Sequence, residues 1–388
     1  MEFSLTEEQQ IFYDQVRRYI TNEVVLPVEE YLRHDHAGEF VWTSWTKLGE
    51  YGLLGLPYPE EYGGSGADAL TTCLALEAAS RSGLDAGTML AWGAHTILCG
   101  VAIWKLGTEE QKQKYLPGIA SGEAIGGLGL TEPNAGSDAT SLHCKAERVD
   151  GGWVLNGTKT FITNGPIGAQ FVVLARTDPD AAEDAMAISA FIVERDFDGF
   201  AAGPEMDKLG NRTSTTSELI FEDCFVPEAN LLGQENFGFL LVGRLILGWE
   251  RSCLLAAAVG GLGAGLEVSA RYAQERHQFN RPIAAFEAVQ HKLADMKIAY
   301  EAGKLLIYRM ATLLEQDEIS LLDAAVAKEF LTRASIRTAD EAVQIHGGYG
   351  YMKEYLVERG IRDAKLASIG GGTSEVQLSI IARALVKM

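Results

Sequence analysis

The chain has 388 residues, 47% of them hydrophobic and 22% charged, which is the composition of a folded protein with a large core. Lys and Arg total 33 against 53 Asp and Glu, so the formal net charge is −20. Because no run of basic residues interrupts this acidity, nucleic acid and anionic membranes are excluded as expected partners. The length predicts two or three domains.

The five cysteines are odd in number and widely spaced, without a CxxC pair, so we expect buried or free thiols in a reducing compartment. The N-terminus "MEFSLTEEQQ" is acidic and lacks an apolar segment, which argues against a signal or transit peptide. No stretch reaches about 18 uninterrupted apolar residues, so we expect no membrane span and a cytoplasmic location. His34 and His36 are expected in a solvated loop, and no metal site is predicted.

Residues 1–122 have a helical pattern. Thr6 and Gln9 form a T-x-x-Q capping box ahead of an apolar face. Two further helical patterns, 71–83 and 87–107, end at glycines, as helices commonly do. The sequence predicts a bundle of helices here.

Residues 123–232 change to short β-branched and aromatic runs. Two turn signals, Asp150–Gly151 and Asn156–Gly157, separate short alternating segments. Strands are predicted at "FVVLART", "AISAFIVER" and "SELIFEDCFVP". This segment is predicted to be a β domain, a small barrel or sandwich.

Residues 233–388 return to helical patterns. The run 239–279 predicts one long helix, and its "GGLGAG" at 260–265 is a weak phosphate motif because no strand precedes it. We expect those glycines to allow close helix packing. Further helices are predicted at 288–314, 321–347 and 374–388, giving an α+β chain of helices, then strands, then helices.

Four segments stand out together. They are "GLGLTEPNAGSD" (127–138), "KTFITNG" (159–165), "QERHQFNRPI" (274–283), and the stretch from "AVQIHGGYG" to "IGGGTSE" (342–375). Each alone has an ordinary structural reading as a turn, a strand or a charged helix end. In this order, across an α–β–α chain, they resemble the acyl-CoA dehydrogenase family, and the resemblance covers essentially the whole chain.

The resemblance implies a dimer or tetramer of three-domain subunits with FAD bound noncovalently where the domains meet. It implies that Thr131 and Thr163 hydrogen-bond the flavin ring, that Phe161 stacks beside it, and that Ser137 reaches both FAD and substrate. Three of the implied FAD contacts, at 276, 278 and 279, would come from a neighbouring subunit. The full set of implied FAD contacts is Leu128, Leu130, Thr131, Ser137, Phe161, Thr163, Arg276, Gln278, Phe279, Gln344, Gly347, Gly348, Thr373 and Glu375.

A distance along the long helix supports sharing of the site between subunits. Glu250 and Arg276 lie 26 positions apart. That separation is roughly 39 Å in an α-helix, too far for both side chains to serve one flavin. The structural alternative is that Arg276 only caps the helix C-terminus, where a cation is favoured.

The resemblance also raises the question of the catalytic base. Many family members have tyrosine, glutamate, glycine and threonine near the C-terminus, with that glutamate as base, whereas this chain has Gly370, Gly371, Gly372 and Thr373. Isovaleryl-type and long-chain-type members place the base on the long helix just before an arginine. The matching pair here is Glu250 and Arg251, so we predict Glu250 as the base, the alternative being a structural glutamate paired with an arginine.

Three substrate contacts follow from the resemblance: Ser137, Arg251 and Gly371. Arg251 either touches the substrate or holds Glu250. The backbone N–H of Gly371 can polarise the thioester carbonyl, because that donor needs no side chain. The glycines also free volume for a branched or bulky acyl group, although a flexible turn between helices is the structural alternative.

Two residues depart from the family pattern. Glu287 stands where a glutamine usually contacts FAD, and Asn280 stands where a glycine is usual. The first departure affects that FAD contact and the second the loop at the FAD interface, and neither removes the core set of matching residues.

The leading hypothesis is α,β-dehydrogenation of an acyl-CoA thioester to the 2-enoyl thioester, with hydride passing to flavin N5 and electrons to an electron-transferring flavoprotein. One alternative is the same reaction on an acyl group carried by an acyl carrier protein. Others are a flavin monooxygenase on this fold, and a scaffold without FAD.

Overall fold

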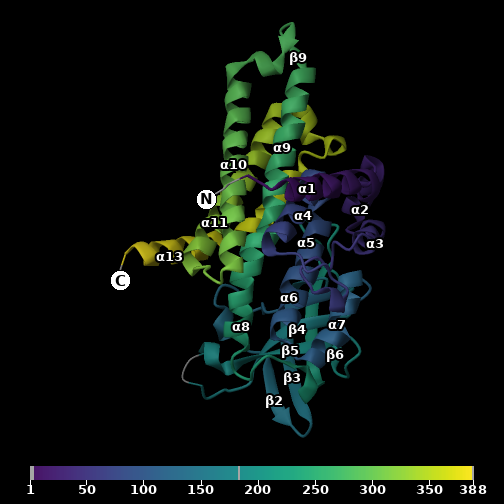
Figure 1. Ribbon diagram of the computed structural model, residues 1–388, viewed down its shortest axis with the longest axis vertical. Helices are drawn as coiled ribbons and strands as arrows, with labels where there is room; N and C mark the ends of the chain where they lie inside the picture. Colours follow the sequence, from purple (N-terminus) through teal and green to yellow (C-terminus); the bar gives the residue numbers. More distant parts are fainter. Residues whose placement is uncertain (1–3, 182–183, 387–388) are drawn as a thin grey trace.

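The computed structural model describes residues 4–181 and 184–386 (Figure 1). Helices form both ends of the chain and a β-sheet occupies the middle, as the sequence predicted for an α+β protein. In Figure 1 the sheet lies at one end of the long axis, and the two long helices α9 and α10 run away from it. We propose domain borders at 122/123 and 232/233, since helix α7 ends at Ser121 and strand β8 ends at Leu232.

The N-terminal helices begin where the sequence places capping residues. The Thr6 hydroxyl accepts from the Gln9 N–H and the Gln9 side chain accepts from the Thr6 N–H, so the predicted capping box is confirmed. A helix with a π-helical middle, η3, occupies the predicted segment 87–107. The elements are α1 Glu7–Tyr19, η1 Ile20–Val24, α2 Val28–Ala37, α3 Trp42–Glu50, η2 Glu60–Tyr62, α4 Ala69–Arg81, α5 Ala86–Trp92, η3 Gly93–Gly100, α6 Val101–Leu106 and α7 Glu109–Ser121.

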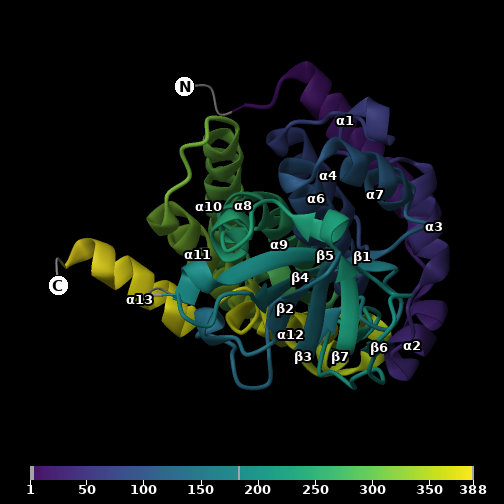
Figure 2. The ribbon, with the colours of Figure 1, turned by 90° about the horizontal axis from the view of Figure 1, so that it is seen from below.

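The middle of the chain forms one mostly antiparallel sheet. Its order is β6-β7-β3-β2-β4-β5-β8, with β1 pairing in parallel with β4. Figure 2 looks onto this sheet from below, with the N-terminal helices beside it. The strands are β1 Gly126–Gly129, β2 Lys145–Val149, β3 Gly152–Thr163, β4 Gln170–Arg176, β5 Ile188–Glu194, β6 Phe200–Ala202, β7 Thr216–Pro227 and β8 Leu231–Leu232.

One of the two predicted turns is correct and the other is wrong. Asp150–Gly151 joins β2 to β3, with Val149 opposite Gly152. Asn156–Gly157 instead lies inside β3, where the register with β7 shifts. Gly157 has φ +146, and a Cβ there would lie 2.8 Å from the Cys144 Cα, so the glycine serves a β-bulge and a close backbone approach.

The C-terminal helices follow the predicted pattern with one correction. The long helix ends at Glu275, not at residue 279, and residues 277–282 form a small hairpin instead. The elements are α8 Gly238–Leu245, η7 Ile246–Leu254, α9 Leu255–Glu275, β9 His277–Gln278, β10 Arg281–Pro282, α10 Glu287–Glu315, α11 Leu321–His346, η9 Gly347–Tyr351, α12 Arg359–Ala364, η11 Lys365–Ser368 and α13 Ser374–Leu385.

The glycines of the long helix serve packing, as predicted. A Cβ on Gly260 would lie 2.3 Å from the Glu77 carbonyl oxygen of α4, and one on Gly263 would lie 3.1 Å from the Arg81 side chain. Helices α4 and α9 therefore approach closely along this stripe, which explains "GGLGAG" without a phosphate.

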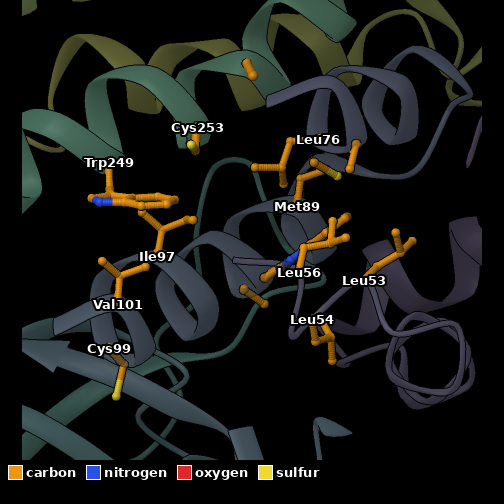
Figure 3. Close-up of a cluster of buried hydrophobic side chains, with 14 of the residues drawn as sticks. Leu53, Leu54, Leu56, Leu76, Met89, Ile97, Cys99, Val101, Trp249 and Cys253 are labelled. Carbon is orange, nitrogen blue, oxygen red and sulfur yellow. The ribbon is translucent and has the colours of Figure 1, made fainter. Parts of the chain in front are cut away.

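The main hydrophobic core joins the N-terminal helices to the long helix. Trp249 of η7 lies over Ile97 and Val101, as Figure 3 shows, and the Cys253 Sγ lies 3.6 Å from the Cys73 Sγ of α4. A Cβ on Gly93 would lie 2.0 Å from Leu254 Cδ1, so η3 and η7 touch here at nearly backbone distance. Burial of these side chains fixes the position of η7.

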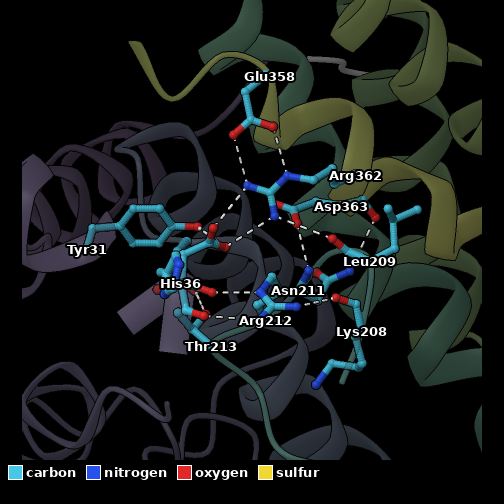
Figure 4. Close-up of polar contacts among 12 residues, drawn as sticks. Tyr31, His36, Lys208, Leu209, Asn211, Arg212, Thr213, Glu358, Arg362 and Asp363 are labelled. Carbon is cyan, nitrogen blue, oxygen red and sulfur yellow. Dashed lines mark hydrogen bonds and ion pairs between the residues drawn. The ribbon is translucent and has the colours of Figure 1, made fainter. Parts of the chain in front are cut away.

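A buried polar junction ties three parts of the chain together (Figure 4). The Arg362 guanidinium of α12 donates to both carboxylate oxygens of Asp35 on α2, at 3.3 and 3.1 Å. Arg212 donates to the Asp35 carbonyl, and the Asn211 N–H donates to Asp363 Oδ1 at 2.7 Å. Helix α2, the loop 207–214 and helix α12 are therefore held at one point.

Several smaller expectations have outcomes in the described residues. All five cysteines are free and buried. His34 and His36 lie on helix α2, so the expected loop is wrong, and the described residues contain no cluster able to hold a metal. Two helices, Ala86–Leu106 and Gly238–Glu275, are long and apolar enough to cross a membrane by length and composition, and the first is 83% buried in the protein core.

We expect Arg362→Met to lower the free energy of unfolding by about 3 kcal/mol or more, because it leaves the Asp35 carboxylate, with 3% of its side chain exposed, without its cation. Denaturant titration measures this change. The matched control is Arg337→Met, whose partner Asp295 is 50% exposed, and there we expect less than about 1 kcal/mol. Equal losses in the two variants would contradict the prediction.

Candidate active site

Glu250 lies in a π-helical segment of the long helix. Residues 246–254 form η7 between α8 and α9, and no sequence pattern predicted this change in winding. π-helical turns inside α-helices occur frequently at functional sites, because the extra residue changes which side chains share a face. Glu250 is 8% exposed and Arg251 is 5% exposed.

Arg251 joins Glu250 to the triglycine loop. Its Nη1 lies 3.5 Å from Glu250 Oε1, and its Nη2 donates to the Gly371 carbonyl oxygen. Its Nε and Nη1 atoms are buried and have no hydrogen-bond partner among the described residues. The structure thus brings Gly371 to the adjacent residues Glu250 and Arg251, although Arg251 and Gly371 are 120 positions apart in sequence.

Gly371 and Glu250 compete for the same space. Gly371 has φ +60, and a Cβ there would lie 2.2 Å from Glu250 Oε1. Any side chain at position 371 would therefore displace the Glu250 carboxylate or be displaced by it. With glycine at position 371, the Glu250 carboxylate can stay where it is. With any other residue there, the carboxylate would have to move.

Lys328 of helix α11 binds two carbonyl groups of the same loop. Its Nζ donates to the Gly370 carbonyl oxygen at 2.5 Å and to the Gly372 carbonyl oxygen at 2.6 Å. Gln377 of α13 also donates to the Gly372 carbonyl, at 3.1 Å. Burial and the nearby Arg251 lower the pKa of Lys328 to about 8.

A second group of predicted residues lies where β1 and β3 end. The Thr160 N–H donates to the Thr131 carbonyl at 2.8 Å, which places Thr131 beside Phe161 and Thr163. Phe161 has φ +59 and is 69% exposed, a conformation uncommon outside glycine. The hydroxyls of Thr131 and Thr163 make no hydrogen bond to any other described residue, so both are free to bind a ligand.

A buried ion pair holds the loop that carries Thr131. Lys159 Nζ lies 2.6 Å from Glu132 Oε1, and it also donates to the Leu130 carbonyl at 3.2 Å. Glu132 accepts from the N–H groups of His143 and Cys144, and these contacts together keep the pKa of Glu132 low despite burial. No sequence pattern predicted this pair.

The remaining residues of this loop are less constrained. Leu128 lies on β1 opposite Val172, and both Leu128 and Leu130 are half-buried against the main core. Ser137 is exposed on the loop between β1 and β2. Their roles in binding stay predictions.

The π-helical segment η3 connects the two groups, since it packs on both β1 and η7. His95 of η3 accepts from the Gly126 N–H through Nδ1 at 2.9 Å and bonds the Ile119 carbonyl through Nε2 at 2.8 Å. Burial lowers the pKa of His95 to about 4, so its ring is neutral and these two bonds fix the start of β1.

A cleft of about 480 Å³ lies at the far end of the long helix. Arg276, Gln278, Gly347 and Gly348, all predicted FAD contacts, line it. The other lining residues, which were not predicted as contacts, are Tyr272, Ile283, Ile345, His346, Tyr349 and Met352. Arg276 caps α9 with its backbone N–H and also places its guanidinium over the Tyr349 ring, 5.4 Å from its centroid.

Four further predicted FAD contacts, all in the C-terminal part of the chain, do not line this cleft. Gln344 is exposed on the last turn of α11, next to the lining residue Ile345. Phe279 is 87% exposed at the hairpin tip, where Asn280 has φ +60 and so adopts the conformation a glycine would take. Thr373 caps α13 through its hydroxyl, and Glu375 is exposed in the first turn of that helix.

Comparisons with known proteins agree with the predicted family. The model of the acyl-CoA dehydrogenase N-terminal domain matches residues 6–123, that of the middle domain residues 127–224, and that of the C-terminal domain residues 236–386. The chain belongs to the acyl-CoA dehydrogenase family. The resemblance inferred from the four sequence segments is thereby confirmed.

Similar proteins share this fold over the whole length. A mitochondrial isovaleryl-CoA dehydrogenase of Solanum tuberosum is 42% identical over 98% of this chain and 91% of its own. The solved butyryl-CoA dehydrogenase of Megasphaera elsdenii is 38% identical, covers 99% of this chain and 100% of its own, and has a TM-score of 0.92. The solved prolyl acyl carrier protein oxidase AnaB is 35% identical over 98% of this chain and 100% of its own, with a TM-score of 0.94.

This acyl-CoA dehydrogenase is an FAD-dependent oxidoreductase, as its family is, and solved relatives include a complex with FAD. The residues present fit the cofactor. A flat exposed ring at Phe161 lies beside two free hydroxyls, and a separate cleft offers the Arg276 cation to a pyrophosphate. FAD supplies the hydride acceptor of the reaction when bound.

We expect Gly371→Ala to lower the rate of flavin reduction by about 10²-fold, because the new Cβ forces the Glu250 carboxylate out of position. Rapid mixing with an acyl thioester, followed by flavin absorbance, measures the rate.

The matched control is Gly66→Ala. Gly66 has φ +62, and no atom lies within 4 Å of an added Cβ, so both variants carry similar backbone strain, about 1–2 kcal/mol, while only one touches Glu250. Equal rates in the two variants would show that the Gly371 space is not needed.

Proposed function

We propose that this enzyme oxidises a branched or otherwise bulky acyl-CoA to the 2-enoyl thioester, with Glu250 as the base. The observation that carries the proposal is the 2.2 Å approach between a Cβ on Gly371 and Glu250 Oε1. A side chain at position 371 and the Glu250 carboxylate cannot both keep these positions, so a side chain there would have to move the end of Glu250. The bare loop also leaves room where a side chain would otherwise approach the acyl group.

In this mechanism each residue of the cluster has one task. Glu250 removes the proton from the α-carbon of the thioester. Arg251 holds Glu250 and the loop, with its Nη1 3.5 Å from Oε1 and its Nη2 on the Gly371 carbonyl. The Gly371 N–H donates to the thioester carbonyl, which makes the α-proton more acidic.

The burial of Glu250 and Arg251 supports a site that excludes water and oxygen once substrate is bound. Electrons that cannot reach oxygen there must leave through a partner. We therefore propose an electron-transferring flavoprotein as the acceptor.

We propose that FAD is bound between two subunits of a homodimer or homotetramer. Support comes from the separation of the two predicted groups: α9 runs unbroken from Leu255 to Glu275, so Glu250 and the Arg276 cleft lie at opposite ends of one long helix. Phe279, 87% exposed beyond the cleft, has the apolar surface that a neighbouring subunit or its FAD would cover.

A second candidate substrate is an acyl group on the phosphopantetheine arm of a carrier protein. It is favoured by the similarity to AnaB, whose description as a prolyl acyl carrier protein oxidase names such a substrate. A flavin monooxygenase is less well supported, because it would have no use for a buried carboxylate at the position of Glu250.

Glu250→Gln is expected to keep FAD bound and to slow the bleaching of the flavin by substrate by about 10³-fold or more, because the amide cannot accept the α-proton. Anaerobic titration of the purified protein measures bleaching. The exposed Glu222→Gln on β7 is the control and should bleach normally. Normal bleaching by Glu250→Gln would remove Glu250 from the mechanism.

A panel of straight and branched acyl-CoA thioesters, and the same acyl groups on a carrier protein, tests the substrate class. We expect branched short acyl-CoA thioesters to give the highest kcat/KM. Bleaching only by carrier-bound thioesters would favour the second candidate, and rapid oxygen consumption by the reduced enzyme would favour the monooxygenase.

Mixed oligomers test the shared site. Glu250→Gln and Arg276→Ala subunits are expected to be inactive alone, but a mixed dimer isolated through two different tags should regain about half of the wild-type activity. The reason is that one of its two sites combines an intact Glu250 with an intact Arg276. Isolated mixed dimers that stay inactive would place both residues in the same subunit's site.

A further inference from the structure

Two buried cations bind three consecutive carbonyl groups of the triglycine loop. Lys328 Nζ binds the carbonyl oxygens of Gly370 and Gly372 at 2.5 and 2.6 Å, and Arg251 Nη2 binds that of Gly371. Lys328 is 3% exposed and comes from α11, whereas the loop lies between η11 and α13. No prediction from the sequence included Lys328.

The direction of these carbonyls fixes the direction of the amides that follow them. In a trans peptide the C=O of one residue and the N–H of the next point in opposite directions, and the described residues contain no cis peptide. Because the Gly370 carbonyl points at Lys328, the Gly371 N–H points away from Lys328. Gly371 is exposed, and its N–H donates to no acceptor among the described residues.

We propose that Lys328 is a positioning residue that aims the Gly371 N–H at the thioester carbonyl by binding the carbonyl oxygens of Gly370 and Gly372. The inference rests on the proposed function, because it assigns a support to the donor used there. Lys328 itself touches neither the substrate nor the α-proton. It acts through the loop.

Without Lys328 the loop would keep the bonds of Arg251 to the Gly371 carbonyl and of Gln377 to the Gly372 carbonyl, but the Gly370 carbonyl would lose this side-chain donor. Gly371 and Gly372 both have positive φ, at +60 and +85, and glycine samples many other conformations at small cost. The ammonium group contributes two charge-assisted hydrogen bonds, which are shorter and stronger than neutral ones. A cation behind the Gly370 carbonyl also polarises that peptide unit and so strengthens its N–H as a donor.

The charges around Lys328 agree with this task. The groups that face it are Arg251 and Glu250 of η7 and Glu329 of its own helix, while α13 brings the neutral Gln377 to the same carbonyl. The pKa of Lys328 is lowered to about 8, by burial first and by Arg251 second. Lys328 is therefore a cation at neutral pH and loses its proton in mildly alkaline solution, when the carbonyls lose part of their support.

The experiment compares Lys328→Met, which removes the donors, with Lys328→Arg, which keeps a cation at every accessible pH. A bound 2-enoyl thioester labelled with ¹³C at its carbonyl gives an infrared frequency that reports the hydrogen bonds to that oxygen. In Lys328→Met we expect this frequency to shift toward its value in solution, and flavin reduction to slow by about 10²-fold at nearly unchanged KM. Lys297→Met, on the exposed face of α10, is the control and should change neither.

A pH series adds a test that does not require removing the buried ammonium group by mutation. In wild type the carbonyl frequency should move toward its solution value as the pH rises through about 8, and in Lys328→Arg it should not. If the carbonyl frequency in Lys328→Met equals that of the wild type, the proposal is overturned. If Lys328→Met does not fold, a carbonyl frequency in the wild-type protein that stays constant across this pH range overturns it instead. The infrared measurement requires only that the thioester binds. The proposed function fails by a different result, namely that no thioester bleaches the flavin of the wild-type protein.

Discussion

The close approach between Gly371 and Glu250 is the constraint on which the rest of the site depends. Position 371 has no side chain and a left-handed backbone, and the Glu250 carboxylate lies where a Cβ would otherwise be. Arg251, the neighbour of Glu250, then reaches the loop carbonyl and completes the cluster. A side chain at position 371 would therefore displace the Glu250 carboxylate and disturb the contact of Arg251 with the loop.

The fold meets this constraint by fixing η7 from several sides. The π-helical winding turns Glu250 and Arg251 inward together, and Gly93 allows η3 to approach η7 closely. The same η3 fixes the start of β1 through the neutral His95, so Glu250 on η7 and the strand ends near Thr131 share one support. The π-helical segment η3 thus positions both η7, by packing, and the start of β1, by hydrogen bonds.

Much of the architecture could be predicted from the sequence, since apolar periodicity, caps and turn residues are local signals. The family resemblance also led to the prediction of Glu250, Arg251 and Gly371 as residues of one site, which the structure brings together, and of four residues that line the distal cleft. Local signals failed at Asn156–Gly157, where a glycine serves a bulge instead of a turn, and at the π-helical winding of η7. Lys328 was missed because its partners are carbonyl groups 42 and 44 positions away, although a single lysine among the buried alanines of α11 was a visible hint.

The junction of Asp35 with Arg362 has a consequence for how the chain is made. The two residues are separated by 327 positions, so the carboxylate of α2 emerges from the ribosome long before its guanidinium partner is synthesised. At ordinary rates of translation the delay is on the order of tens of seconds. Throughout that interval the N-terminal helices carry an acid that they cannot bury at low cost, which keeps their docking onto the sheet provisional until the C-terminal helices arrive.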